Sequence, residues 1–127
     1  MQWNIDSERP VYIQLIEQIQ AGIISGHYSL GDKLPSVREL AAQAGVNPNT
    51  MQRALAELEQ TGLIYTHRTS GRYITSDVEM IRKLKKQSGK DIVLDFIERM
   101  KQIGYEKEEI LEIVTKILGE MIEWILF

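Results

Sequence analysis

Two short amphipathic helices joined by a tight turn, within residues 34–55, constrain the fold of this chain more than any other feature. Ser36, followed by a glutamate three residues later, forms a capping box, which predicts that a helix begins there. Gly45 lies where this helix must end and the chain must reverse, since glycine accepts a positive φ. Asn47 suits the N-cap of the next helix, and Pro48 suits its first turn. The stretch therefore predicts a helix-turn-helix.

The segments on either side extend this element. A first helix is expected from Pro10 to Gly26, because apolar residues recur there at helical spacing, at Tyr12, Leu15, Ile16, Ile19 and Ile23. After the third helix ends at Gly62, two β-like runs at 63–66 and 72–75 flank a polar loop that suits a hairpin. Three helices followed by a hairpin are the order of a winged helix-turn-helix.

Beyond the hairpin, the periodicity predicts two further helices, with Gly104 between them. The Ser88-Gly89 pair is expected to kink or break the first of the two. We therefore predict a mainly α chain with a small β-hairpin wing. Residues 1–76 would form a winged helix-turn-helix domain, an arrangement typical of DNA binding, and residues 77–127 a two-helix dimerisation segment.

Composition restricts the chemistry of the chain. The 127 residues are 43% hydrophobic, which is ordinary for a globular protein with a core. The absence of cysteine excludes disulfides, thiolate nucleophiles and cysteine-bound zinc, and it fits a reducing cytoplasm, where we expect the protein to act. The polar start lacks a signal-peptide pattern, and no apolar stretch is long enough to span a bilayer. His27 and His67 lack partners at metal-ligand spacing, and no nucleophile–base pair is visible, so we expect no cofactor, metal or enzymatic activity.

The charge pattern gives a weak indication of the partner. The net charge of −3 argues mildly against nucleic acid. Residues 33–72, however, carry five cations against three anions, so the excess of negative charge lies elsewhere in the chain. Because phosphates sense only the face presented to them, the sign of this segment fits a DNA partner.

The first turns of the third helix carry the candidate base-reading side chains, which are Asn47, Asn49, Thr50, Gln52 and Arg53. Asparagine and glutamine amides can pair with adenine, and arginine can pair with guanine or a phosphate. A solvated helix face is the alternative interpretation of these polar residues. Solvated faces are commonly rich in glutamate and lysine, and neither occurs between residues 47 and 55. The composition of this face therefore favours DNA recognition.

Candidates for contacts to the DNA backbone precede and follow this helix. Arg38 can contact a phosphate, with Ser36 at the start of the same helix; a surface ion pair with Glu39 or Glu57 explains Arg38 equally well. The basic hairpin tip can enter the minor groove or clamp a phosphate, and a solvated loop is the alternative. The candidates in the hairpin are Arg68, Ser70, Gly71 and Arg72.

The C-terminal helices expose more apolar surface than a two-helix hairpin can bury. About fifty residues build too small a core to stand alone easily. Packing against a second copy would cover this surface and would set two recognition helices on a two-fold-symmetric site. A membrane-surface helix is the alternative, but the acidic polar face disfavours anionic lipid. The residues predicted to form the dimer interface are Phe96, Met100, Ile110, Val114, Ile117, Met121, Trp124 and Ile125.

In these motifs the chain resembles the GntR family of bacterial winged-helix regulators, and in particular the small YtrA-like branch of that family. The matching segments stand in the family's order, at residues 10–16, 34–41, 46–50 and 58–64. The resemblance implies that Arg38 contacts a phosphate, that Thr50 belongs to the recognition-helix motif and that Gly71 is a wing glycine. Pro48 and Gln52 replace arginines that are frequent in the broader family, so the family's base contacts do not transfer to these positions.

The residues and the resemblance together predict a homodimeric DNA-binding transcriptional regulator that acts as a repressor on a two-fold-symmetric operator. Helix 47–61 is expected in the major groove, and the wing at 67–72 on the backbone or in the minor groove. Whether a small-molecule effector exists is left open. The alternative function is a winged-helix protein-interaction module that does not bind DNA.

Overall fold

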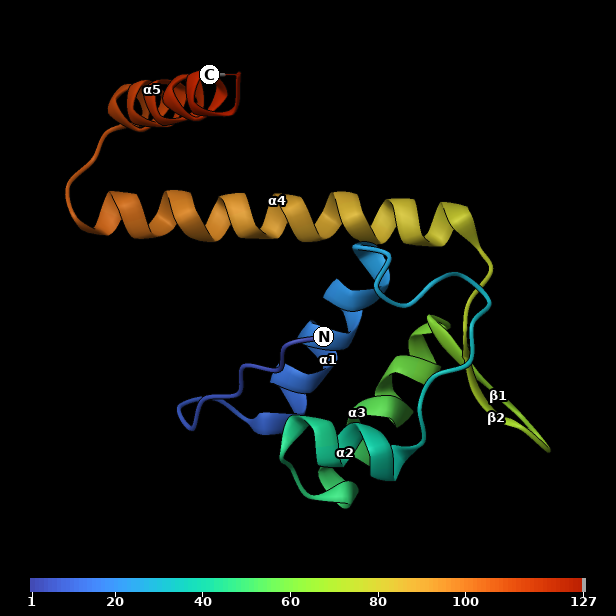
Figure 1. Ribbon diagram of the computed structural model, residues 1–127. Coiled ribbons are helices and arrows are strands. Elements are labelled where there is room, and N and C mark those ends of the chain that lie inside the picture. The colour runs from blue at the N-terminus through green and yellow to red at the C-terminus, as the bar shows by residue number, and fades with distance from the viewer. Residues whose placement is uncertain (127) are drawn as a thin grey trace. The chain divides into compact units, whose positions relative to one another are not determined.

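The computed structural model describes the backbone of residues 1–126 and the side chains of residues 1–122. The elements follow one another as α1 (Val11–Ile24), α2 (Val37–Ala44), α3 (Pro48–Thr61), β1 (Ile64–His67), β2 (Gly71–Ile74), α4 (Val78–Gln102) and α5 (Lys107–Leu126), as Figure 1 shows. The predicted fold class, mainly α with a small β-hairpin, is therefore confirmed.

The chain forms two compact units, of which the first is Met1–Lys85 and the second begins at Lys86. The first turns of α4 belong to the first unit because Met80, Ile81 and Leu84 pack against its core. Within this unit, α1, α2 and α3 gather around a common centre and the hairpin projects away from them (Figure 1).

The core of the first unit lies where α1 and α2 meet α3. Each helix contributes the apolar side chains that recur along one face, so burial follows the helical period of the sequence. Side chains at most 1% exposed come from all three helices and from both strands, and the largest are Leu15, Ile19, Leu40, Met51, Leu55, Leu58, Ile64 and Ile74.

Both helices of the helix-turn-helix begin at the predicted N-caps, Ser36 and Asn47. The Ser36 hydroxyl accepts a hydrogen bond from the N–H of Glu39 at 3.2 Å. The side-chain oxygen of Asn47 accepts one from the N–H of Asn49 at 2.8 Å, at the start of α3. Gly45 ends α2 with a φ of 69°, a conformation that favours glycine. These contacts fix where the two helices begin and how the chain turns between them.

Two glutamines of α1 hold the segment that precedes the helix. The Gln14 side chain, only 3% exposed, accepts from the N–H of Asp6 at 2.9 Å and donates to the carbonyls of Asp6 and Arg9, both at 2.9 Å. Gln18 pairs in the same way with the N–H and carbonyl of Asn4, at 3.0 and 2.7 Å. The segment before α1 is therefore attached to that helix through its main chain, much as a β-strand is attached to its neighbour.

The hairpin pairs β1 with β2 antiparallel, with Tyr65 opposite Tyr73. The segment before α2 runs along the outer side of β2. The N–H of Leu34 donates to the carbonyl of Arg72 at 2.9 Å, and the N–H of Ile74 donates to the carbonyl of Asp32 at 2.8 Å. These bonds fix the start of α2 beside the wing, although the two lie more than thirty residues apart in sequence.

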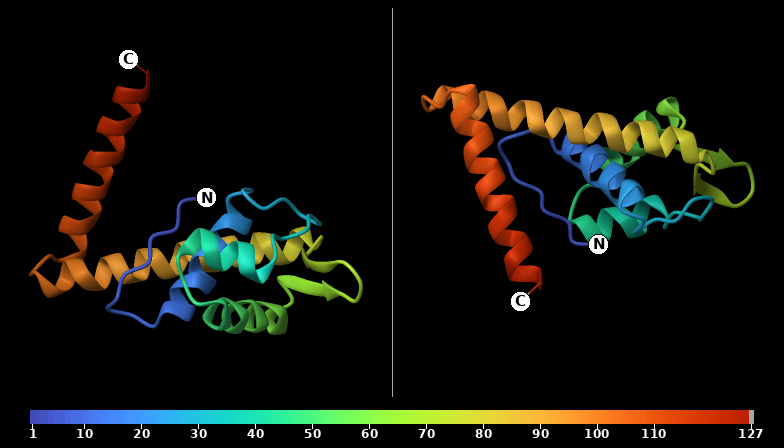
Figure 2. Two further views of the ribbon diagram at one scale, coloured as in Figure 1. Left: turned by 60° about the horizontal axis from the view of Figure 1, so that its bottom comes forward. Right: turned by 90° about the horizontal axis from the view of Figure 1, so that it is seen from above.

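In the second unit, α4 continues through Ser88 and Gly89 as one uninterrupted helix, as both views in Figure 2 show. The predicted kink or break at this pair is therefore wrong. A glycine inside a helix keeps its backbone hydrogen bond, and its cost of about 1 kcal/mol relative to alanine is too small to interrupt a helix of this length. Gly104, with a φ of 98°, stands between α4 and α5 as expected. None of the helices in the described part of the chain is both long and apolar enough to cross a membrane.

Candidate nucleic-acid interface

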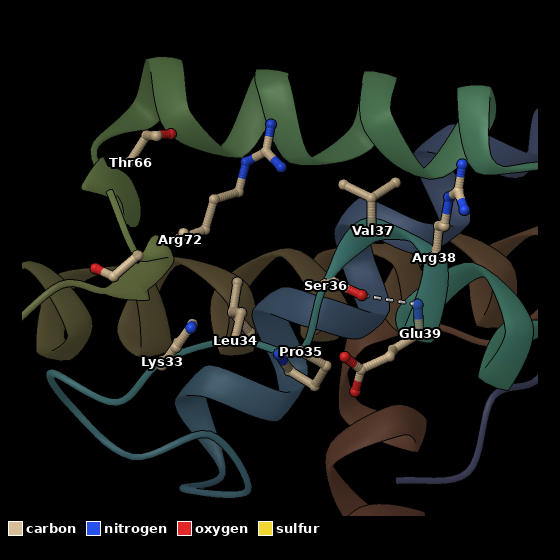
Figure 3. A pocket seen from close by; sticks show the side chains of 11 residues that line it. Lys33, Leu34, Pro35, Ser36, Val37, Arg38, Glu39, Thr66 and Arg72 are labelled. Atoms are coloured by element: carbon tan, nitrogen blue, oxygen red, sulfur yellow. Dashed lines mark hydrogen bonds between the residues drawn. The ribbon is translucent and has the colours of Figure 1, made fainter. Parts of the chain in front are cut away.

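A groove of about 810 Å³ separates the start of α2 from the wing. Its lining carries three cations, Lys33, Arg38 and Arg72, against one carboxylate, Glu39. Five of the residues predicted to contact DNA line it, namely Ser36, Arg38, Ser70, Gly71 and Arg72, together with Lys33, Leu34, Pro35, Val37, Glu39 and Thr66. Figure 3 shows the side chains of Arg38 and Arg72 pointing in the same direction from the two sides of the groove. The structure thus brings together residues from two separate parts of the sequence.

Arg38 is exposed on the α2 side of the groove. The sequence left open a surface ion pair with Glu39 or Glu57. Among the side chains that the structure describes, no carboxylate lies within salt-bridge distance of Arg38, and Glu57 pairs instead with Arg53. The Arg38 guanidinium is therefore available to an anion in the groove.

Arg72, on the wing side, is already paired. Its Nε lies 2.5 Å from Oε1 of Glu59, and the Thr66 hydroxyl donates to the same carboxylate. Partial burial alone would raise the pKa of Glu59, but the hydrogen bonds from Thr66 and Arg72 and the charge of Arg72 hold that pKa below its ordinary value. Arg72 therefore holds the wing against α3 in addition to lining the groove.

Lys33 lines the same groove, and the sequence analysis did not select it as a site residue. It forms a β-bridge with Tyr73, and its Cε would lie 3.2 Å from a Cβ at Gly71. The charge count included Lys33, but nothing in the local sequence indicates that the loop before α2 runs beside the wing. Only the pairing with β2 shows that this lysine lies beside the wing and lines the same groove as Arg38.

The predicted base-reading face of α3 is exposed and lies outside the groove. Asn47, Asn49, Gln52 and Arg53 are exposed, and Thr50 is half-buried. Because Met51, Ala54, Leu55 and Leu58 take the inner face, the polar residues of the first turns are left for a partner. The face therefore offers amide and guanidinium groups at the positions that the sequence predicts.

Arg53 makes two contacts within the chain. Its guanidinium carbon lies 3.6 Å from the centroid of the Tyr12 ring on α1, and its Nε lies 4.0 Å from Oε1 of Glu57. The Arg53 side chain is nevertheless 60% exposed. The ion pair with Glu57 lies within α3, between residues four apart, whereas the contact with Tyr12 depends on how α1 crosses α3.

The tip of the wing carries the remaining candidates. Arg68 is exposed in the turn and does not line the groove. The Tyr73 hydroxyl donates to Ser70 at 2.8 Å, which anchors the loop to β2. Gly71 has a φ of 114°, a backbone conformation that other residues rarely adopt. The described residues contain no group of His, Cys, Asp or Glu side chains able to hold a metal ion.

The predicted dimerisation residues differ in exposure. Phe96, Ile117 and Met121 are exposed, whereas Met100 and Val114 are half-buried. Ile110 is only 7% exposed in the single chain. The side chains of Trp124 and Ile125 lie outside the described part of the structure. Further large apolar side chains are exposed on the same two helices, including Ile92, Val93, Leu94, Leu111, Leu118 and Ile122.

Known proteins share both the sequence and the fold. Residues 11–74 match the family described as "Bacterial regulatory proteins, gntR family". The "HTH-type transcriptional repressor YtrA" of Bacillus subtilis is 36% identical over 120 residues, which cover 91% of this chain and 89% of YtrA. The solved structure of a "GntR family transcriptional regulator from Listeria monocytogenes" is 45% identical, with a TM-score of 0.81 over 88% of this chain and 98% of that chain. AraR(DBD), solved in complex with operator ORE1, is 31% identical, with a TM-score of 0.51 over 59% of this chain and 94% of that chain.

Proposed function

Because the chain belongs to the gntR family of bacterial regulatory proteins and is a transcriptional regulator, we propose that it works as a homodimeric repressor on a two-fold-symmetric operator. Two observations carry this proposal: the groove between α2 and the wing, which Lys33 and Arg38 line, and the exposed polar residues on the first turns of α3. Cations next to a helix face rich in amides suit a duplex, because phosphates fix the register and base edges supply the specificity.

In this proposal α3 lies in the major groove. Asn47, Asn49, Gln52 and Arg53 contact base edges, since their side chains are exposed on its first turns. The DNA backbone contacts Arg38 and Thr50 and the wing residues Arg68 and Arg72. Ser36, Ser70 and Gly71 line the path of the backbone and let it approach closely, because their side chains are small.

In this proposal, DNA binding and dimerisation are carried by successive parts of the chain. Residues 1–76 bind DNA, and residues 77–127 pair two copies through the apolar faces of α4 and α5. Exposed Phe96, Ile117 and Met121 support this pairing, because a large unpartnered apolar surface is costly in water and a second copy would cover it. The protein acts by binding alone, in the cytoplasm, and requires no cofactor.

Selection of bound sequences from a random duplex pool tests the proposal. A two-fold-symmetric operator predicts enrichment of an inverted repeat whose half-sites are one helical turn, or a multiple of it, apart. Affinity for the enriched duplex should fall steeply with salt concentration. Failure to enrich any duplex, with no salt-sensitive binding to mixed DNA, would instead identify the chain as a protein-interaction module.

A further inference from the structure

The contact between Tyr12 and Arg53 joins the first helix to the recognition helix. Tyr12 is the second residue of α1 and is half-buried, and Arg53 lies in the second turn of α3. The guanidinium carbon of Arg53 lies 3.6 Å from the centroid of the Tyr12 ring. This separation is well inside the range in which a cation is attracted to the face of an aromatic ring.

The ring leaves the hydrogen-bonding groups of Arg53 available. Guanidinium N–H groups point outward in the plane of the group, so an aromatic ring against one face need not occupy them. The Arg53 side chain remains 60% exposed in this position. The ion pair with Glu57, at 4.0 Å between exposed groups four residues apart, adds only weakly to the restraint. Tyr12 is therefore the main contact that restricts where the guanidinium lies.

An arginine whose side chain is already restrained pairs with a base at a lower entropic cost than a mobile arginine does. A long side chain loses rotamer freedom when it pairs with a base edge, and that loss is smaller where another contact already limits the rotamers. We infer that Tyr12 is a positioning residue for base recognition, which acts by holding the Arg53 guanidinium in the orientation that pairs with one base. This inference rests on the proposed function, in which Arg53 contacts a base edge.

Two substitutions at Tyr12 separate positioning from packing. Tyr12→Phe keeps the ring, whereas Tyr12→Leu keeps apolar bulk and removes the ring. Both lose the same hydroxyl, so the difference between them reports the aromatic face. Circular dichroism melts of the full chain would show that each variant is folded at the temperature of the binding measurements.

The binding probes are a fluorescein-labelled duplex carrying the site that the unaltered protein selects from a random pool, and duplexes with each single base-pair change in that site. Arg53→Ala identifies the base pair that Arg53 reads. At that pair, Tyr12→Leu should lower the preference for the selected base about two- to fivefold, while Tyr12→Phe should retain it. The double variant Arg53→Ala with Tyr12→Leu should show the same preference at that base pair as Arg53→Ala alone.

Several outcomes would overturn the inference while leaving DNA binding intact. A packing role alone predicts that Tyr12→Leu weakens binding to every duplex equally; such uniform weakening contradicts positioning. Equal losses in Tyr12→Phe and Tyr12→Leu would also contradict it, as would an Arg53→Ala variant with unchanged preferences at every base pair. Failure of the unaltered protein to select any duplex would instead contradict the proposed function itself.

Discussion

Oε1 of Glu59, near the end of α3, accepts hydrogen bonds from Nε of Arg72 on β2 and from the hydroxyl of Thr66 on β1. One carboxylate oxygen therefore joins the recognition helix to both strands of the wing. Since α3 and the wing are proposed to contact the same duplex, their relative position matters for binding. Glu59 fixes that position without itself facing the groove.

Replacing this carboxylate should change stability in a pH-dependent way. The pKa of Glu59 is lower in the folded chain than its ordinary value of 4.5. Its contribution is therefore fully present above pH 4.5 and is lost as the pH falls through the folded pKa. Glu59→Gln should lower the free energy of unfolding by about 1 kcal/mol at pH 7, with a smaller difference from the unaltered chain in acid. Urea unfolding from pH 7 down to pH 3 measures this, and a constant difference across the range would refute the assignment.

Arg38→Ala should reduce the salt dependence of DNA binding. If the guanidinium neutralises one phosphate, the slope of log K against log salt concentration should become shallower by about 0.9. Fluorescence anisotropy with a mixed-sequence duplex gives the slope. Arg82→Ala is a matched control, because Arg82 on α4 pairs with Glu79 and does not line the groove. Equal slopes in the unaltered chain and Arg38→Ala would assign Arg38 a structural role.

Lys33 should contribute in the same way, although the sequence did not single it out. Because Lys33 lines the groove together with Arg38, Lys33→Ala should also make the slope of log K against log salt concentration shallower by about 0.9. In the double variant with Arg38→Ala, the slope should become shallower by about twice as much, provided that each cation neutralises its own phosphate. Lys33→Arg should keep the slope, because the charge is retained. A slope that depends on Arg38 alone would remove Lys33 from the interface.

Two glycine-to-alanine substitutions should shift stability in opposite directions. Gly71→Ala places a Cβ on a residue with a φ of 114° and 3.2 Å from Cε of Lys33, so it should destabilise the wing by about 1–2 kcal/mol. Gly89→Ala meets nothing within 4 Å inside α4 and should stabilise that helix by about 0.5–1 kcal/mol. Thermal unfolding followed by circular dichroism compares them. Stabilisation by Gly71→Ala would show that the wing turn adopts another conformation.

A charge on the apolar face of α5 should separate the proposed dimer. Ile117 is 50% exposed, and Ile117→Glu would bury a carboxylate in the interface, at a cost of several kcal/mol. Multi-angle light scattering should then report a monomer, and affinity for the inverted repeat should fall. Lys116→Glu places a carboxylate at an exposed position on the side of the helix that carries Glu112 and Glu120, and should leave the assembly unchanged. A dimer that survives Ile117→Glu must use a different surface.

The sequence was sufficient to predict the features that depend on local rules. Ser36 and Asn47 cap their helices, and Gly45 turns the chain, because each of these conformations depends on only a few neighbouring residues. The helical period likewise identified the inner face of α1, where Leu15, Ile19 and Ile23 are buried. The same rules do not hold at Ser88-Gly89, because the low helix propensity of this pair is too small a cost to interrupt α4.

Contacts between distant segments could not be predicted in this way. The pairing of Glu59 with Arg72 requires the wing to fold back on α3, and Lys33 reaches the groove only because its loop pairs with β2. Tyr12 meets Arg53 only where α1 crosses α3. Each depends on helix crossing or strand register, which charge and periodicity along one segment do not specify.

The hydrogen bonds of Gln14 have a consequence for how the chain can vary. They engage the main chain of Asp6 and Arg9, whose N–H and carbonyl groups are the same whatever side chains these positions carry. The N-terminal segment can therefore exchange its exposed residues in evolution or design and keep its path. Gln14 has no such latitude, because a shorter or charged side chain would leave three main-chain groups without their partner.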